Sequence, residues 1–320
     1  MTWITVITAL GGCGGTTPAT MTAAPRVAVS WGFTAPWDAR SDSSVAAHGK
    51  SLDVVVSGWI QLDSLTGQPA QLYRDNTPRA ATAGRFALVT SYGGTRFHPE
   101  MIRRLAADPG ALAFTASRTA SLLSSGGYEG VVLDLEDQSR DDVPRTIRVV
   151  RAIVDSVHRR GVRVVALAIP AADTAAYPTA SLAAVADLLV VMLYDEHWST
   201  SAPGPIATPL WVRRTLGARI AAAGASQIVA ALPLYGYLWR PNQPGQPISF
   251  EDARHAAAQA NVELVHDPSS GSMHAVKPND WELWVTDAEL LRTLIGEVTT
   301  LGATRVAYWR LGLEDPGIWR

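Results

Sequence analysis

The stretch YEGVVLDLEDQ, residues 128–138, joins the pattern of a buried strand to a pair of carboxylates. The Gly-Val-Val-Leu run before Asp134 contains no polar side chain, as expected for a parallel strand that is covered on both faces. Side chains alternate along a strand, so Asp134 and Glu136 are predicted to share one face. The stretch therefore predicts a covered sheet with two acidic groups at the carboxyl end of one strand.

Similar apolar runs recur along the chain from Arg26 onward. Helix-like stretches separate them, and this alternation is typical of a parallel α/β sheet. Eight strands over nearly the whole chain favour a closed barrel over an open doubly wound sheet. The predicted strands are residues 27–31, 53–59, 85–91, 130–135, 162–168, 188–194, 228–234 and 305–311.

The helices predicted between these strands have clear boundary signals in the middle of the chain. The clearest begins at Asp141-Asp142, has Pro144 in its first turn and closes at Arg159-Arg160-Gly161. The first two connections are rich in Gly, Pro and Ser and are only weakly helical. Further helices are predicted at residues 99–107, 111–124, 176–186, 209–223 and 287–301.

The span between the seventh and eighth predicted strands is too long for one loop and one helix. It contains a capped helix, SFEDARHAAAQA, and then VELVHD, SMHAV and WELWV around a turn at residues 267–271. We therefore predict an α/β fold, a (β/α)8 TIM barrel at residues 26–320, with a small α+β insertion on its rim at about residues 240–286.

Composition excludes several classes of function. The net charge of −2 offers no basic surface for nucleic acid, and 47% hydrophobic residues indicate a large core. The seven His show no paired ligand spacing and there is a single Cys, so neither a metal site nor a disulfide is expected. No Gly-rich phosphate loop or G-x-S-x-G elbow is present, and we expect no cofactor. The eleven Trp would suit a sugar-binding cleft, although core packing should account for about half of them.

The single cysteine, Cys13, lies in an unusual setting. An apolar run leads into Leu-Gly-Gly-Cys at residues 10–13, followed by a Gly/Thr/Pro/Ala tether. The segment at residues 1–25 resembles a bacterial lipoprotein signal in which Cys13 is lipidated, and the only expected membrane contact is through that anchor. Against this reading, the segment is short and has no Lys or Arg before the apolar run. An incidental cysteine near the terminus is the alternative.

The carboxylate pair at the end of residues 130–135 has a chemical and a structural interpretation. Like charges held close together cannot both ionise easily, so one group should keep its proton near neutral pH. A protonated carboxylic acid beside an ionised one suits glycosidic bond cleavage. In the structural interpretation, the acidic residues at the strand end cap the next helix, and we expect Asp137, Asp141 and Asp142 to be caps or solvated loop groups.

Polar and aromatic residues also follow three later predicted strands. They lie in VVMLYDEHW (190–198), ALPLYGYLW (231–239) and VAYWRLGLEDPGIW (306–319). The carboxyl ends of barrel strands all meet on one face, so a shared cleft explains these endings better than separate packing does. The candidate residues in this cleft are Tyr194, Asp195, Tyr235, Trp239 and Trp309, together with Trp31 at the end of the first strand.

These four segments, in this order, resemble the family 18 glycoside hydrolases, the chitinase-like barrels, over roughly residues 27–319. Within that family they are most similar to the bacterial spore-germination and cortex-lytic N-acetylglucosaminidases. The family's strand-four signature is D-G-x-D-x-D-x-E, and here it reads EGVVLDLE over residues 129–136. The signature alone is moderately specific, whereas the ordered set of segments is strongly so.

The resemblance implies roles for matching residues. Glu136 matches the general acid, Asp134 the aspartate that orients the substrate's 2-acetamido group, and Tyr194 the tyrosine that hydrogen-bonds the acetamido oxygen. Asp195 is expected near the sugar or Tyr194, and Trp309 matches the aromatic floor of the −1 subsite. In such enzymes the acetamido oxygen itself attacks the anomeric carbon, which gives an oxazolinium intermediate and retention of configuration.

Three positions depart from the family pattern. Val132 replaces the second aspartate of the signature, so the carboxylate relay below Asp134 is absent. The germination branch often carries a neutral residue there, which implies that activity survives, with a shifted pH optimum. Glu129 replaces the first aspartate, where we expect a structural effect at the strand end. Leu238 replaces a residue that is often polar, which puts substrate contacts near Trp239 in doubt.

The sequence therefore predicts a glycosidase that cleaves β-1,4-linked N-acetylglucosamine glycans, either peptidoglycan or chitin-like polymers. The alternative is an inactive chitinase-like protein of the cell envelope that binds glycans, or more weakly a structural lipoprotein with a vestigial cleft. Inactive members usually lose the acid glutamate, and the presence of Glu136 with Asp134 and Tyr194 favours the enzyme. The expected location is secreted or in the cell envelope, with Cys13 as a lipid anchor.

Overall fold

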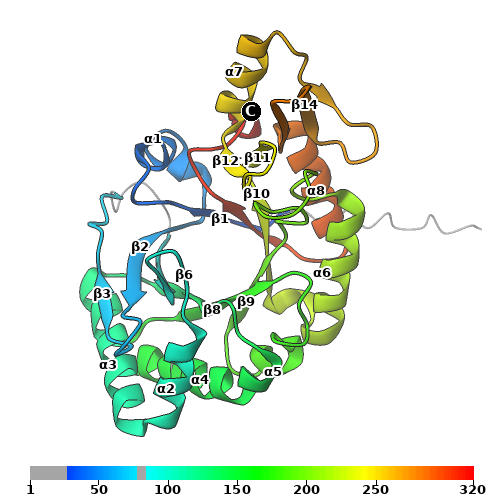
Figure 1. The fold of residues 1–320 in the computed structure, drawn as a ribbon. Helices are drawn as coiled ribbons and strands as arrows, with labels where there is room; N and C mark the ends of the chain where they lie inside the picture. The colour runs from blue at the N-terminus through cyan, green and yellow to red at the C-terminus, as the bar shows by residue number, and fades with distance from the viewer. Residues whose placement is uncertain (1–26, 78–83) are drawn as a thin grey trace, which may run out of the picture.

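The computed structural model describes residues 27–77 and 84–320, and its centre is a closed ring of eight parallel strands (Figure 1). The ring closes where β1 pairs with both β16 and β2. Each observed strand overlaps a predicted one, so the predicted (β/α)8 barrel is confirmed. In chain order the barrel strands are β1 (Val29–Phe33), β2 (Val54–Leu62), β4 (Gly84–Thr90), β7 (Gly130–Asp134), β8 (Val164–Pro170), β9 (Leu188–Met192), β10 (Ile228–Pro233) and β16 (Arg305–Trp309).

The interior of the barrel is filled unevenly. Trp31 and Phe86 fill one side with their rings 5.0 Å apart, and small side chains such as Ala166 and Ala231 occupy the other. Gly130 makes room for this packing, because a Cβ atom there would lie 2.5 Å from the Phe86 ring. Bulky residues on β1 and β4 therefore require glycine at the start of β7.

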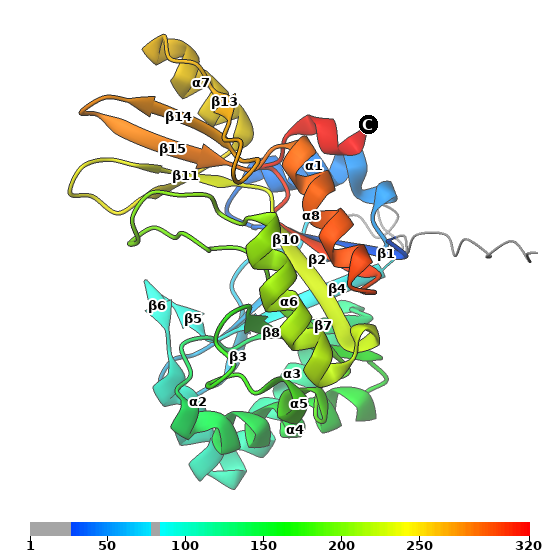
Figure 2. The ribbon, with the colours of Figure 1, turned by 90° about the vertical axis from the view of Figure 1, so that its right-hand side faces the viewer.

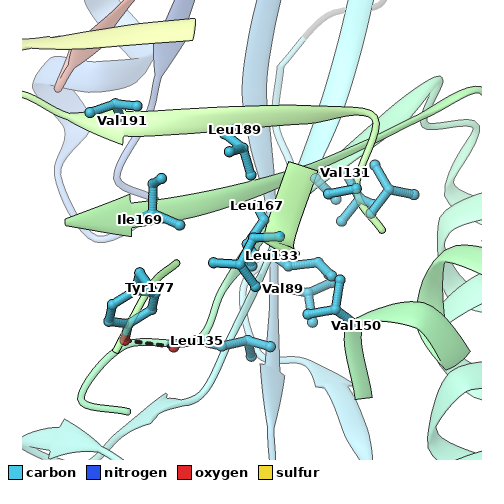
Figure 3. Close-up of a cluster of buried hydrophobic side chains, with 14 of the residues drawn as sticks. Val89, Val131, Leu133, Leu135, Val150, Leu167, Ile169, Tyr177, Leu189 and Val191 are labelled. Atoms are coloured by element: carbon cyan, nitrogen blue, oxygen red, sulfur yellow. Dashed lines mark hydrogen bonds between the residues drawn. The ribbon is translucent and has the colours of Figure 1, made fainter. Parts of the chain in front are cut away.

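The outer faces of the strands pack against the surrounding helices. Leu133 of β7 and Leu167 of β8 are buried in a cluster that includes Val150 of α4 (Val143–Arg159), as Figure 3 shows. Because inner and outer faces are both apolar, the strands read as continuous hydrophobic runs, which is why the sequence revealed them clearly. The other barrel helices are α1 (Ala39–His48), α2 (Pro99–Ala107), α3 (Pro109–Gly126), α5 (Thr179–Ala183), α6 (Pro209–Ala223) and α8 (Ala288–Thr300).

Two connections differ from the predicted helices. The helix predicted at residues 176–186 is reduced to α5, because the Tyr177 carbonyl accepts a hydrogen bond from Arg219 and Pro178 is the N-cap residue. Between β2 and β4 the described residues contain no helix. They contain β3 (Pro69–Gln71), which pairs antiparallel with β2.

Asp142 is the N-cap residue of α4, as the sequence suggested, but its side chain makes no capping hydrogen bond and is shielded from solvent. Its side chain is buried and accepts two hydrogen bonds from Arg103 Nε, at 2.9 and 3.0 Å, and another from the Ser139 hydroxyl at 2.6 Å. The hydrogen bonds from Arg103 lower the pKa of Asp142 to about 2, against the opposing effect of burial. Asp142 therefore ties the start of α4 to α2, a long-range contact with no local sequence signal.

The segment between β10 and α8 folds as a separate small sheet with its own core, the predicted α+β insertion. Its five strands pair antiparallel in the order β12-β11-β15-β14-β13. Figure 2 shows this sheet projecting from the barrel beside α7. The elements are β11 (Gly236–Trp239), β12 (Gln246–Ile248), α7 (Phe250–Ala260), β13 (Val265–His266), β14 (Met273–Lys277) and β15 (Trp281–Val285).

The lipidation prediction for Cys13 and the tether at residues 1–25 lie outside the described residues. Within residues 27–77 and 84–320, no helix has both the length and the apolar character needed to cross a bilayer.

Candidate active site

Asp134 and Glu136 meet at the open end of the barrel. Asp134 is the last residue of β7 and Glu136 lies two residues further, so both side chains line the same cavity. The two carboxyl groups hydrogen-bond to each other, and the Thr90 hydroxyl on β4 donates to Asp134 Oδ2 at 2.9 Å. Val132, the next residue down on the same face of β7, is buried and apolar. Thr90 thus gives Asp134 a polar partner where the strand itself offers none.

The two carboxyl groups differ in how firmly they hold a proton. Burial, reinforced by the charge of Asp134, raises the pKa of Glu136 well above its usual value. Burial also raises the pKa of Asp134 to about 6, while the hydrogen bonds with Thr90 and Glu136 act to lower it. Near neutral pH the pair therefore shares one proton, and Glu136 is the group that keeps it.

Tyr194 and Asp195 line a second wall of the cavity, just beyond β9, which is separated from β7 by β8 alone. The hydroxyl of Tyr235 donates to Asp195, and that of Tyr237 also hydrogen-bonds to it. Burial raises the pKa of Asp195 to about 6, and the two tyrosines oppose that rise. Burial and the charge of Glu136 raise the pKa of Tyr194, so its phenol stays protonated and available as a donor.

Trp309, at the end of β16, supplies an aromatic floor between these walls. Its ring lies nearly parallel to that of Tyr194, with centroids 6.2 Å apart and an interplanar angle of 16°. Phe33 of β1 meets the same indole edge-on at 5.6 Å. The Trp309–Arg310 peptide bond is cis. A flat apolar surface thus lies beside the acidic pair, as a bound sugar ring requires.

The cavity enclosed by these residues has a volume of about 700 Å³. Aromatic side chains extend it in two directions: Trp37 and Trp59 on the β1–β2 side, and Trp198 and Trp211 on the β9–α6 side. Trp37 is 54% exposed and Trp198 48% exposed. Large, solvent-exposed indoles beside a buried acid pair indicate a groove for a polymer with apolar faces.

The structure does not bring every predicted residue to the cavity. Tyr235 is buried behind Asp195 and acts on the site through that carboxylate. Trp239 lines a neighbouring hollow with Arg240 and Trp281. Trp31 is buried below the cavity against Phe86, because the first strand runs two residues further than predicted and Phe33 takes the position at its end.

Several residues around the cavity were not predicted. Thr90 falls on the inner face of β4 by simple alternation, so that signal was available in the sequence. Trp37 and Trp198 each follow a strand end closely, which also pointed to the rim. Asp173 lines the cavity from the β8–α5 loop, and no local pattern marks it. Where the chain is described, no group of three or more His, Cys, Asp or Glu side chains is placed to hold a metal ion.

No protein-family profile matches the chain, but individual proteins do. YdhD of Bacillus subtilis, whose name describes a sporulation-specific glycosylase, is 27% identical over 248 residues. That alignment covers 73% of this chain and 59% of YdhD, so the chain spans little more than half of that relative.

Solved structures share the fold over almost the whole chain. The spore cortex-lytic enzyme SleL of Bacillus cereus superposes with a TM-score of 0.83 at 17% identity, covering 92% of this chain and 74% of SleL. A class V chitinase from Pseudomonas fluorescens superposes with a TM-score of 0.78 at 22% identity, covering 92% of this chain and 98% of the chitinase. The resemblance to the chitinase-like barrels, and among them to the spore cortex-lytic enzymes, is thereby confirmed.

Proposed function

We propose that this chain is a glycoside hydrolase that cleaves β-1,4-linked N-acetylglucosamine glycans by a retaining, substrate-assisted mechanism. The observation that carries the proposal is the unequal carboxyl pair, Glu136 protonated and Asp134 beside it, in one cavity with Tyr194 and the Trp309 ring. The names of YdhD, SleL and the chitinases support the same reaction class.

In the first half of the reaction the bond to the leaving sugar breaks. Glu136 donates its proton to the glycosidic oxygen, and the acetamido oxygen of the substrate attacks the anomeric carbon. The carboxylate of Asp134 orients the acetamide and stabilises the positive charge that spreads onto it, while the Tyr194 hydroxyl donates to the acetamido oxygen. The sugar ring rests on Trp309. The products are a shortened glycan and a cyclic oxazolinium ion.

In the second half, water opens the oxazolinium ion. The Glu136 carboxylate accepts a proton from water, whose oxygen attacks the anomeric carbon from the face that the leaving sugar vacated. The bond to the acetamido oxygen breaks, the configuration is retained, and Glu136 is protonated again. The raised pKa of Glu136 suits this exchange, since the same group must first give and then regain a proton.

Glu136→Gln tests the acid assignment. The amide keeps the shape of the side chain but has no proton to donate, so release of a reporter from N-acetylglucosamine oligomers should fall by about 10²- to 10⁴-fold while sugar binding persists. Oligomers without the N-acetyl group should be inert, and thiazoline analogues should inhibit. Equal turnover by the variant would refute the acid role, and equal turnover of plain glucose oligomers would refute substrate assistance.

The substrate in nature and the cellular location belong to the same proposal. Peptidoglycan and chitin-like polymers both carry the required acetamide, and both lie outside the cytoplasm, which agrees with a secreted or envelope protein lipidated at Cys13. Mass analysis of the products from peptidoglycan and from chitin oligomers, side by side, would identify the substrate. Mass analysis of the N-terminal peptide from the native host would show whether Cys13 carries a lipid.

A further inference from the structure

Arg219 of α6 is fully buried, yet no carboxylate accepts a hydrogen bond from it. Its five N–H groups all donate to the β8–α5 loop, at distances between 2.5 and 3.1 Å. This is the full donor capacity of a guanidinium group. The acceptors are the carbonyls of Pro170, Ala171, Asp173 and Tyr177 and the hydroxyl of Thr179.

A charge buried among neutral acceptors is costly, and the cost is offset only when every donor is satisfied. Burial accordingly lowers the pKa of Arg219, with only the charge of Asp173 acting to raise it. The arrangement fixes both ends of the β8–α5 loop to a single planar group. Part of this loop, Pro170 to Asp173, lines the substrate cavity.

Tyr177 connects this loop to the residues on either side of Glu136. Its hydroxyl donates to the Leu135 carbonyl at 3.1 Å, shown as the dashed line in Figure 3, and accepts from the Gln138 backbone N–H at 3.1 Å. One phenol oxygen thus bridges the turn that carries Glu136 and Asp137. Asp137 has a φ of 58°, in the left-handed region, so this turn needs support from outside.

The side chain of Gln138 reinforces the same turn. Gln138 Nε2 donates to the Glu136 carbonyl at 2.9 Å, and Gln138 Oε1 accepts from the Thr146 hydroxyl of α4 at 3.3 Å. Tyr177 itself is 2% exposed and touches no substrate cavity surface. The turn that presents the acid is therefore held from behind by α4 and by a loop that Arg219 immobilises.

We propose that Tyr177, held in place by Arg219, is a positioning residue that sets the orientation and burial of Glu136. The proposal rests on the acid role given to Glu136 above, and it assigns a part of the catalytic apparatus to residues that lie outside the cavity. Without the phenol bridge, the backbone at Leu135 and Gln138 would lose a shared partner. Glu136 could then turn toward water and away from the glycosidic oxygen.

Tyr177→Phe removes the bridging oxygen and leaves the ring. Since a displacement of about 1 Å can cost on the order of 10²-fold in rate, we expect kcat on N-acetylglucosamine oligomers to fall by about 10- to 100-fold with KM nearly unchanged. Greater exposure should also lower the pKa of Glu136, which moves the alkaline limb of kcat/KM to lower pH. Arg219→Lys, which keeps the charge and at most three donors, should shift both quantities in the same direction.

Tyr128→Phe is the matched control. Tyr128 is equally a buried tyrosine whose hydroxyl hydrogen-bonds, at 2.9 Å to Asp75, but neither of these two residues lines the cavity or contacts the turn at Glu136. Its loss should lower the melting temperature and leave kcat and the alkaline limb in place. A Tyr177→Phe protein that behaved in this way would show that the bridge stabilises the fold and does not position the acid.

A measurement without substrate separates this proposal from the proposed reaction. The side-chain carboxyl of Glu136 can be titrated by NMR in protein labelled at glutamate, and its signal identified by its loss in Glu136→Gln. A lower pKa in folded Tyr177→Phe supports the positioning role even if the parent cleaves no N-acetylglucosamine polymer. An unchanged pKa, with unchanged kcat where turnover exists, overturns it.

Discussion

Single residues decide how the acidic pair divides its proton. Asp134 has a pKa of about 6 because burial outweighs its two hydrogen bonds, and Glu136 is shifted further because it also faces the charge of Asp134. Two carboxyl groups buried this close together destabilise each other's charged form, and such pairs cluster at functional sites.

Thr90→Val should move the acid limb of the pH–rate profile. The proposed mechanism requires Asp134 ionised and Glu136 protonated, so kcat/KM should rise with pH near the Asp134 pKa of about 6 and fall as Glu136 loses its proton. The Thr90 hydroxyl lowers the pKa of Asp134, so its removal should shift the rising limb to higher pH, by up to about one unit.

Thr90→Ser keeps the hydroxyl and is the control, with the acid limb expected at its parental position. Profiles of kcat/KM from about pH 4 to 9 provide the test. If the valine and serine variants gave the same acid limb as the parent, the hydrogen bond to Asp134 would have no part in setting its ionisation.

Glu136→Gln should make the protein more stable at alkaline pH while it removes activity. A group with a raised pKa in the folded state contributes its full stability below its unfolded pKa, and that contribution is lost as pH rises through the folded pKa. Glutamine cannot ionise, so the variant avoids this loss. We therefore expect the variant to be more stable than the parent at pH 9 and to differ little from it at pH 4.

Thermal or urea unfolding of parent and variant at both pH values measures this gain. An equal stability difference at pH 4 and pH 9 would show that the change comes from packing and not from the ionisation of Glu136. Glu129→Gln, at the exposed amino end of the β7 region, is a control for a glutamate whose surroundings are open to water.

At the scale of elements, most barrel strands could be predicted from the sequence, because a strand covered on both faces is a continuous hydrophobic run. Helix α4 was equally clear, since Pro144 and the Arg159-Arg160-Gly161 ending mark its limits. The short α5 was overpredicted, because the buried and distant Arg219 binds the Tyr177 carbonyl, which a longer helix would have used, and the Thr179 hydroxyl at the start of α5. Local sequence patterns thus predicted the strands and helices, and long-range hydrogen bonds decided where helix α5 begins.

Much of the candidate site was also predictable from the sequence, because several of its residues lie at or just beyond strand ends. Asp134, Glu136, Tyr194 and Trp309 end strands, and strand ends share one rim by topology. The sequence predicted Trp31 at the end of the first strand. The strand runs two residues further, so Phe33 takes that position and Trp31 is buried below it. Contacts made through loops, such as those of Asp173 and Tyr177, depend on tertiary packing and have no sequence period to reveal them.

Trp37→Ala should weaken the binding of long substrates. Trp37 lies in the loop after β1, packs edge-on against Trp59 at 4.7 Å and leaves 54% of its surface exposed beside the cavity. An exposed indole of this kind offers a stacking face to a sugar unit removed from the cleaved bond. We expect KM for long N-acetylglucosamine oligomers to rise about tenfold, equal to about 1.4 kcal/mol, with kcat changed little.

Oligomers too short to reach Trp37 should be unaffected, so the ratio of KM values for long and short substrates is the measurement. Phe114→Ala is the control, because Phe114 of α3 is 51% exposed and does not line the cavity. A uniform rise of KM for all lengths would place the effect of Trp37 at the reaction centre and not on a distant sugar.

For the whole molecule, the inserted sheet has a core of its own and also shares a buried cluster with the barrel, in which Tyr237 and Trp239 pack with Ile206 and Leu313. Leu283, Val285 and Ala253 belong to a cluster within the insertion, separate from the two barrel clusters. None of the residues that line the substrate cavity comes from 236–285, although Tyr237 reaches Asp195 behind it. The insertion thus supports one wall from behind, while the residues that line the cavity belong to the barrel strands, to their loops and to α6.

This division predicts the pattern of hydrogen exchange. Without ligand, β13 and β14 should exchange sooner than β7 and β8, because β13 is a two-residue edge strand with exposed side chains and the barrel strands are buried on both faces. A thiazoline inhibitor should slow exchange in the loops after β7, β8 and β9, and leave the β13–β14 hairpin unchanged. Mass-spectrometric exchange with and without inhibitor measures both effects. Protection spread evenly over the insertion would mean that the inserted sheet closes onto the ligand. That result would contradict the expectation that only the barrel contacts it.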